Sequence, residues 1–355
     1  MEIKGKYTSA KIFAESVEEE AMSLIYGLCN HPAFTDVPIR QMPDTHAGKG
    51  ICIGFTAPLT DMVNPAHVGC DIGCTVSSII YSGIIDKETY PLLEHRVRKA
   101  VPTGFALQPK RVFDLKDFFK FMNQGMSSAR STWPEIVQSV KIDEKYIDNM
   151  LKRVGMDAGV FYKSISSLGG GNHFLELGLD PDRHPVWTIH CGSRNFGMKV
   201  FKYWETVSKK GPSNKDLKDE INKIKATVER SQIHAEIQKL KEETAKRHPM
   251  GYLSGDNMSG YLTDLFFCQL YAAWNHQCIR AAISKIMLDM YGAKETEFIQ
   301  SVHNYINPND HIIRKGAISS YEGQKMIIPF NMRDGLAICT GKSNPDWNYS
   351  APHGA

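Results

Sequence analysis

The stretch "VGCDIGC", residues 68–74, places a carboxylate and a thiolate three residues apart, at Asp71 and Cys74. Gly73 lies between them and frees the backbone to curl, so both side chains could face one ion from a single turn. A pair at this spacing also occurs often by chance. The pair therefore predicts a metal site only if other parts of the chain supply further ligands.

Three histidines could supply them. His173 follows three glycines in "GGGNHF", His190 ends an expected strand in "WTIHCGSR", and His303 lies in "SVHNY". A single histidine is more often a hydrogen-bonded core or surface residue, but three in settings rich in Gly, Asn and Ser favour a metal centre. This donor set suits zinc, manganese, iron or cobalt, and a thiolate can bridge two ions. Because the donors exceed what a closed four-coordinate site needs, we expect open positions for a substrate.

Two further features indicate phosphate chemistry. The run "LGGGNHFLEL" offers free backbone amides that could wrap a phosphate, although a plain tight turn is the simpler interpretation. Arg194, in "HCGSRNFG", could clamp a phosphate or form a structural ion pair. His353, in the C-terminal "SAPHGA", is expected to be exposed in a rigid turn. There an imidazole could act as a nucleophile that forms a phosphoramidate, or be a tail residue without function.

The elements that must position these residues are mixed. Acidic residues followed by apolar residues at helical spacing predict a helix over 14–28, whereas 40–82 reads as short strands joined by loops. Residues 258–292 are apolar nearly all round, which predicts a helix packed inside the protein. Helices and strands do not alternate strictly, so the pattern indicates an α+β fold rather than a doubly wound sheet.

A charged segment interrupts this pattern. Between residues 209 and 248, apolar residues recur every three to five positions, which predicts a long amphipathic helix or a helix pair after the breaker "KKGPSN". These residues are Leu217, Ile221, Ile224, Val228, Ile233, Ile237 and Leu240. We assign 205–250 as an inserted helical arm within a single catalytic domain over 1–355. A solvated structural helix is favoured over an interaction arm.

Composition gives the broad class of protein. With 42% hydrophobic residues and a net charge of +3, the 355-residue chain has an ordinary globular profile that does not by itself indicate a polyanionic partner. The N-terminus has no apolar signal region, and no apolar run is long enough to span a bilayer. The eight cysteines have no regular spacing, which favours reduced thiols. We expect a cytoplasmic protein with no membrane partner.

Several motifs together resemble one known family. "MPDTHAGKG", "VGCDIGC", "GGGNHFLEL", "HCGSRNFG", "HNY" and "SAPHGA", in this order, resemble the RtcB family of GTP-dependent RNA ligases, from about residue 40 to the last residue. The resemblance implies a mixed α+β fold special to these ligases. Its sheets would surround a central cleft that holds two Mn²⁺ ions and a guanylate.

The resemblance also implies roles for individual residues. Cys74 would bridge the two ions, and the other metal ligands would be Asp71, His173, His190 and His303. His353 would accept GMP. Asn172 would contact the nucleotide phosphates with help from Asn304, and Glu176 would read the guanine edge. Asp44, in "MPDTH", would have a supporting role. Arg194 is a candidate catalytic residue from its sequence setting, as a phosphate clamp or in a structural ion pair.

The implied reaction joins an RNA 2′,3′-cyclic phosphate or 3′-phosphate end to a 5′-hydroxyl end through a histidine–GMP intermediate, in tRNA splicing or RNA repair. A protein activator is a candidate partner, and the residues do not show whether turnover needs one. Contacts to RNA phosphates are expected from Arg194, Arg314 and Lys315, with binding that weakens steeply as salt rises. Two alternatives stay open: a metal-dependent RNA phosphoesterase that does not ligate, and an RNA-binding scaffold that retains a metal site.

Three departures from the family pattern are expected to matter. Thr75 follows the ligand Cys where the family usually has Gly, and "PFNMRDG", residues 329–335, replaces a loop of small residues, which could alter nucleotide choice. The chain ends at Ala355, where the family continues with a tail that helps to close the guanine pocket.

Overall fold

The computed structural model describes residues 1–210, 214–247 and 251–354. Its α-helices are α1 (Glu19–Cys29), α2 (Tyr90–Ala100), α3 (Leu115–Thr132), α4 (Glu144–Val154), α5 (Ala158–Lys163), α6 (Arg194–Lys209), α7 (Asn214–Thr227), α8 (Ile233–Arg247) and α9 (Gly255–Tyr291). Its strands are β1 (Glu2–Lys4), β2 (Ser9–Ile12), β3 (Ile39–His46), β4 (Ile53–Pro58), β5 (Met62–Val63), β6 (Thr75–Tyr81), β7 (Phe174–Leu179), β8 (Pro185–Cys191), β9 (Leu253–Ser254), β10 (Glu295–Val302), β11 (Asn304–Ile306), β12 (Ile312–Lys315), β13 (Ala317–Ser319), β14 (Lys325–Asn331), β15 (Gly335–Thr340) and β16 (Ser350–Pro352).

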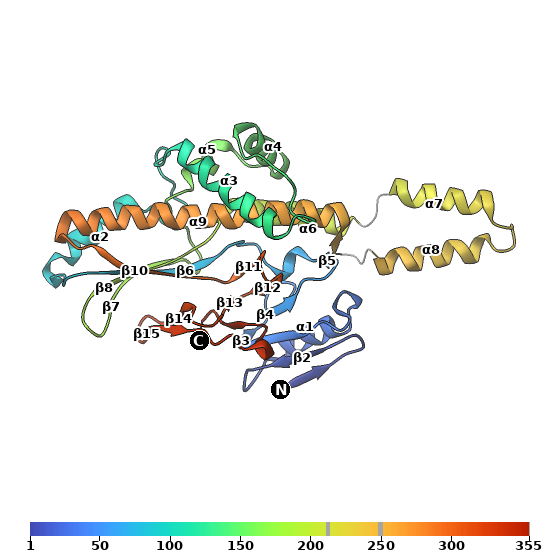
Figure 1. Cartoon of the computed structure of the whole chain (residues 1–355), viewed down its shortest axis with the longest axis horizontal. Coiled ribbons are helices and arrows are strands. Elements are labelled where there is room, and N and C mark those ends of the chain that lie inside the picture. The colour runs from blue at the N-terminus through green and yellow to red at the C-terminus, as the bar shows by residue number, and fades with distance from the viewer. Residues whose placement is uncertain (211–213, 248–250, 355) are drawn as a thin grey trace.

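The long helix α9 forms the centre of the molecule. It runs between α3, α4 and α5 on one side and the sheet that contains β6 and β10 on the other (Figure 1). Buried residues such as Phe267 and Tyr271 face the helical layer, and Ile279 and Ile283 pack against the sheet. Burial on both sides explains why the sequence of this helix is apolar nearly all round, and the predicted buried helix over 258–292 is confirmed.

A four-stranded antiparallel sheet, in the order β10-β6-β8-β7, carries much of the candidate site. Its register places His190 opposite Val76 on β6 and opposite Phe174 on β7. One face packs on α9 through residues such as Trp187 and Ile189. Since side chains alternate between the two faces of a strand, His190 points to the other face.

The second sheet has six strands in the order β1-β2-β3-β4-β12-β11, of which only the β2–β3 pair is parallel. The small sheet β13–β16 contacts β3 and β4 of this sheet, and the small sheet β14–β15 packs against β10 and β6 of the four-stranded sheet. Asp44 lies on β3 and His353 directly follows β16, so residues far apart in the chain approach each other here. The mixture of helices with mainly antiparallel sheets confirms the predicted α+β class.

The helices α7 and α8 lie side by side and extend away from the rest of the molecule (Figure 1). The range expected for the arm, 205–250, contains the end of α6 and both of these helices, while residues 211–213 and 248–250 lie outside the described residues. Of the predicted apolar positions, those with described side chains are only half-buried, namely Ile221, Ile224, Val228, Ile233, Ile237 and Leu240. Residues on neighbouring turns of both helices are exposed, as expected for a solvated helix pair.

One predicted boundary is wrong. The helix expected over 14–28 begins at Glu19, because Glu18 has an extended backbone and serves as the N-cap position. Glu19 and Glu20 lie in its first turn, where acidic side chains interact favourably with the helix dipole. Within the described part of the chain, no helix is both long enough and apolar enough to cross a membrane.

Candidate metal centre

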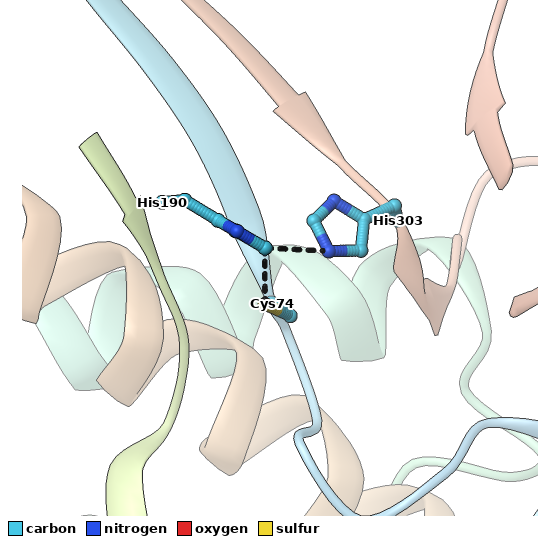
Figure 2. A group of neighbouring side chains, drawn as sticks. All are labelled: Cys74, His190 and His303. Atoms are coloured by element: carbon cyan, nitrogen blue, oxygen red, sulfur yellow. Dashed lines mark hydrogen bonds between the residues drawn. The ribbon is translucent and has the colours of Figure 1, made fainter. Parts of the chain in front are cut away.

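Cys74, His190 and His303 converge at the end of the four-stranded sheet where β6 begins and β8 and β10 end. Nε2 of His190 lies 3.2 Å from Sγ of Cys74 and 3.3 Å from Nε2 of His303 (Figure 2). All three residues are buried, and their ligand atoms fall within 4.8 Å of one another. Figure 2 shows the three side chains coming from separate segments that meet at one point.

A second group shares the same thiol. Asp71, Cys74 and His173 also bring their ligand atoms within 4.8 Å of one another. Oδ2 of Asp71 lies 2.8 Å from Nε2 of His173, and that nitrogen is 3.8 Å from Sγ of Cys74. All five predicted ligands therefore meet, and Cys74 lies where the two groups join.

Glycines allow this packing at two positions. Gly73 has φ +73°, a conformation that disfavours a side chain, and its amide donates to the Asn304 carbonyl at 2.7 Å. Gly192 has no such backbone constraint, but a Cβ there would lie 2.3 Å from Oδ1 of Asp71. Sequence reasoning missed Gly192, and its position two residues after His190 was the signal that could have drawn attention to it.

Backbone carbonyls orient two of the histidines. Nδ1 of His173 lies 3.0 Å from the Leu168 carbonyl, and Nδ1 of His190 lies 3.0 Å from the Asn172 carbonyl. Because a carbonyl can only accept a hydrogen bond, each Nδ1 carries the proton and each Nε2 is left with its lone pair or a second proton. This is the outer-shell arrangement that directs histidine Nε2 atoms toward a metal ion.

The electrostatics of the cluster favour a bound cation. Burial lowers the pKa of His190 to about 4, with the His173 charge adding to the effect, so its imidazole is neutral. Burial and the neighbouring Asp71 carboxylate raise the pKa of the Cys74 thiol well above its usual value. Burial alone would raise the pKa of Asp71, but the hydrogen bond and charge of His173 outweigh it and lower that pKa.

His173 is the only one of these imidazoles whose own basicity increases. Burial would lower its pKa, yet the hydrogen bond with Asp71 and the neighbouring Cys191 raise it to about 10. Without an ion, a proton on His173 thus balances the Asp71 charge, and the thiol keeps its proton. A divalent cation supplies the positive charge that would release both protons, so the donor set fits a metal with mixed sulfur, nitrogen and oxygen ligands.

His353 lies beside this cluster and is held by Asp44. Nδ1 of His353 is 2.7 Å from Oδ2 of Asp44, which also accepts the Gly354 amide at 3.3 Å. The ring centroids of His353 and His303 are 4.9 Å apart. The expectation of an exposed histidine is wrong, because packing against Asp44, His303 and Gly316 leaves only 25% of its side chain accessible.

Asn172 and Glu176 flank the cluster on the loop before β7 and on β7 itself. The Asn172 side chain is exposed, while its backbone carbonyl accepts a hydrogen bond from Nδ1 of His190. Glu176 is half-buried and pairs with Thr188 in the register that pairs Phe174 with His190. Paired residues of an antiparallel sheet share a face, so Glu176 points to the same side as Thr188. Thr188 and His190 are two residues apart on β8 and therefore share that face.

Arg194 and Asn304 make structural contacts. A Cβ at Gly169 would overlap the Arg194 guanidinium, so the arginine lies on the loop formed by glycines 169–171, the glycine loop. Nε of Arg194 donates to Oγ of Ser167 at 3.3 Å. Within residues 1–210, 214–247 and 251–354 it has no ion pair. Asn304 uses its amide to hold two loops, accepting the Gly316 amide at 3.0 Å and donating to the Asp71 carbonyl at 3.4 Å.

The expected RNA contacts of Arg314 and Lys315 are wrong, because both side chains are buried, at 0% and 5% exposure. Arg314 forms an ion pair with Asp310 at 2.8 Å. Nζ of Lys315 donates to three carbonyls, those of Lys49, Ile51 and Ala66 at 3.0, 3.4 and 3.1 Å. Burial lowers the pKa of Lys315 to about 8. These cations hold loops together and have no free face for a phosphate.

Comparisons with known proteins agree with the motifs. The family model described as tRNA-splicing ligase RtcB matches residues 29–355. The RNA-splicing ligase RtcB of Escherichia coli K12 is 27% identical over 357 residues, which cover 96% of this chain and 78% of that protein. The RNA-splicing ligase RtcB of Mycobacterium tuberculosis H37Rv is 25% identical over 367 residues, with 88% and 78% covered.

A third relative matches over a shorter range. The tRNA-splicing ligase RtcB of Methanococcus maripaludis is 25% identical over 245 residues, which cover 59% of this chain and 49% of that protein. The family match spans the loops that carry Asp71, Cys74 and the three histidines of the cluster. The chain therefore belongs to the tRNA-splicing ligase RtcB family, a family of RNA ligase enzymes.

Proposed function

We propose that this chain joins RNA ends through a guanylylated histidine, with GTP as the nucleotide and Mn²⁺ as the metal. The observation that carries the proposal is the pairing of His353 with Asp44 beside the metal ligands. A carboxylate that accepts the Nδ1 proton leaves the lone pair on Nε2, which is the atom a nucleophilic imidazole needs.

The ligands Asp71, Cys74, His173, His190 and His303 would hold two ions, because the two groups of donors share one thiol. When bound, the ions supply positive charge that stabilises phosphoryl oxygens. The chain's own contribution is to keep His173 and His190 directed at the site through the carbonyls of Leu168 and Asn172.

The first proposed step is transfer of GMP to His353. Nε2 attacks the α-phosphorus of GTP, a P–N bond forms, and the bond to pyrophosphate breaks. The imidazole becomes positively charged, and Asp44, which holds Nδ1–H at 2.7 Å, stabilises that charge. The chain thereby stores the guanylate as a phosphoramidate.

The following steps act on the RNA. Water opens a 2′,3′-cyclic phosphate to a 3′-phosphate, an oxygen of that phosphate attacks the guanylate, and the P–N bond breaks to restore Nε2 of His353. The 5′-hydroxyl of the second RNA end then attacks the activated 3′-phosphate, and GMP leaves. Each step exchanges one bond to phosphorus for another and needs no redox partner.

Three residues would bind the guanylate. Glu176 faces the same side of the sheet as His190, where its carboxylate can accept hydrogen bonds from the donor edge of guanine. The exposed Asn172 amide lies next to His173 and can reach the nucleotide phosphates. Arg194 would contact phosphate from its place on the glycine loop, and the phosphate contact of Asn304 stays a prediction.

The RNA substrates proposed are those with a 3′-phosphate or 2′,3′-cyclic phosphate and a 5′-hydroxyl, as produced in tRNA splicing or RNA cleavage. A cytoplasmic location suits the site, because a reducing compartment keeps the Cys74 thiol available as a ligand. The exposed hairpin tip around Phe330, on the loop 329–335, lies where nucleotide choice would be adjusted, since the Pro329 carbonyl is near Gly354. A protein activator stays a prediction.

The test is covalent labelling with α-labelled GTP and Mn²⁺. The parent chain and His234→Ala, which removes an exposed histidine on α8, should both retain label, whereas His353→Ala should retain none. The label should survive base and be lost in acid, as a phosphoramidate is. Equal labelling of His353→Ala, or no labelling of a metal-loaded parent chain, would contradict the proposed nucleophile and favour the phosphoesterase or scaffold alternatives.

A further inference from the structure

The loop between α2 and α3 presents one aromatic ring entirely to solvent. Phe105 is 106% exposed, the highest value among the large exposed hydrophobic side chains of the described residues. Burying a phenylalanine side chain normally stabilises a protein, and a ring left in solvent contributes none of that stabilisation to this fold. Its presence there is better explained by contact with another molecule.

The loop that carries Phe105 is ordered. The Ala106 amide donates to the Thr103 carbonyl at 3.2 Å, which closes a turn with Phe105 at its tip. Gly104 supplies the positive φ of +64° in that turn. The buried Gln108 anchors the end of the loop by donating to the carbonyls of Ala100 and Ser166 at 2.9 and 2.7 Å. With the backbone of the turn held in place, binding needs to order only the ring itself, which lowers its entropic cost.

The same loop rests on the segment that carries two proposed site residues. The Gly104 amide donates to the Gly169 carbonyl at 2.7 Å, and the Leu168 amide donates to the Pro102 carbonyl at 2.8 Å. The Leu168 carbonyl in turn receives Nδ1 of His173. Phe105 is therefore placed at the rim of the metal centre, beside the glycines that lead to Asn172 and His173.

The surroundings of Phe105 in the chain are strongly basic. Residues 95–113 contain no acidic residue and five cations, all exposed, namely Arg96, Arg98, Lys99, Lys110 and Arg111. Arg98 pairs with Glu94 on α2 at 2.8 Å. Glu94 and Asp114 flank the segment, whose five cations contrast with a net charge of only +3 over the whole chain. An aromatic ring among cations is the combination that binds single-stranded nucleic acid, through stacking and phosphate contacts.

We propose that Phe105 stacks on a base of single-stranded RNA near the end to be joined, while Lys99, Lys110 and Arg111 contact its phosphates. This inference rests on the proposed function for the identity of the substrate. It assigns a substrate-binding role to the segment 95–113, which replaces the buried Arg314 and Lys315 as the basic RNA contact. Single-stranded RNA is favoured over a duplex, whose bases are stacked on each other and leave no face for the ring.

The experiment measures binding of the full-length chain to a labelled single-stranded RNA with a 3′-phosphate, by fluorescence anisotropy without GTP. Phe105→Ala should raise the Kd about 5- to 150-fold, the range of one lost base stack. Phe105→Trp should restore binding because it keeps a stacking face. Tyr26→Ala is the matched control, since Tyr26 is an aromatic residue on α1 that is 56% exposed, and its Kd should equal that of the parent.

An RNA with abasic positions at the same end separates stacking from other effects. On that RNA the parent and Phe105→Ala should bind alike, because there is no base to stack. Unchanged binding of Phe105→Ala to intact RNA would overturn the proposal and indicate that the ring contacts a protein. An equal loss on intact and abasic RNA would also overturn it. Labelling of the parent by GTP is measured separately, so a failure of the proposed function would appear there and not in the Kd.

Discussion

Replacing Gly192 with alanine should weaken metal binding through one steric contact. The added Cβ would lie 2.3 Å from Oδ1 and 2.6 Å from Cγ of Asp71, whereas ordinary contacts begin at 3.4 Å. The backbone of Gly192 does not have the positive φ that would strain alanine, so the carboxylate must instead move by about 1 Å. That movement would disturb its 2.8 Å contact with His173.

The expected loss follows from what misplaced metal ligands cost. Disturbing the groups that orient a metal ligand lowers affinity about 10- to 100-fold, which is about 1.4–2.7 kcal/mol. Titration calorimetry with Mn²⁺ on the parent and on Gly192→Ala gives both the Kd and the number of ions bound. We expect the weakening to fall on the ion that uses Asp71, leaving the group of Cys74, His190 and His303 intact.

A matched control and a second variant make the reasoning refutable. Gly27→Ala, on α1, adds a Cβ with no neighbour within 4 Å and should leave Mn²⁺ binding unchanged. If Gly192→Ala lowers Tm sharply, Asp71→Asn tests the same ligand without added volume. Two tight Mn²⁺ sites in a folded Gly192→Ala chain would refute the assignment of Asp71 as a ligand held in place by this close contact.

Three further outcomes follow from the structure. Asp44→Asn should slow guanylate labelling of His353 about tenfold or more, because a neutral acceptor stabilises the cationic imidazole by about 1.5 kcal/mol less than a charged one. Equal labelling rates of Asp44→Asn and the parent would contradict this. Lys315→Met should lower the free energy of unfolding by about 1–3 kcal/mol in denaturant titrations, since three carbonyls lose their donor. The salt dependence of RNA binding, measured by anisotropy, should stay that of the parent. Unchanged stability with a weaker salt dependence would restore Lys315 as an RNA contact. Burial lowers the pKa of His67 to about 3 from 6.5, so the contribution of its neutral ring to folding stability is fully present above pH 6.5 and is lost as pH falls toward 3. Between pH 7 and pH 5 the loss in the free energy of unfolding is about 2 kcal/mol. His67→Phe should reduce that pH dependence in urea titrations, and an unchanged dependence would exclude His67 as its source.

The clustering of the five candidate ligands could be predicted because their residue types and order carry the information. Asp71 and Cys74 lie within one turn, and the structure brings His173, His190 and His303 to them from three other segments. The helix over 258–292 was equally predictable, because its apolar character is a property of local sequence.

The environment of individual side chains was harder to predict. Lys315 and Arg314 look like surface cations in the sequence, yet β12 lies between β4 and β11, where three carbonyls and Asp310 enclose them. The pairing of Asp44 with His353 joins residues 309 positions apart and depends on tertiary packing. A sequence without a second aligned chain contains no signal for such distant contacts.

The exposure of Phe105 was also not predictable from the sequence. Phenylalanine is usually buried, so residue type alone would place Phe105, between α2 and α3, in the core. Only the turn closed by Thr103 and Ala106, and its contact with the glycine loop, show that the ring faces solvent at the rim of the site.

The central claim is that this chain joins RNA ends, and the most direct measurement is a ligation assay. One RNA carries a 2′,3′-cyclic phosphate or 3′-phosphate and the other a 5′-hydroxyl, and both are incubated with the chain, GTP and Mn²⁺. We predict a joined product that requires GTP and disappears with His353→Ala. A cyclic phosphate that is opened to a 3′-phosphate without any joined product, with or without GTP, would contradict the account.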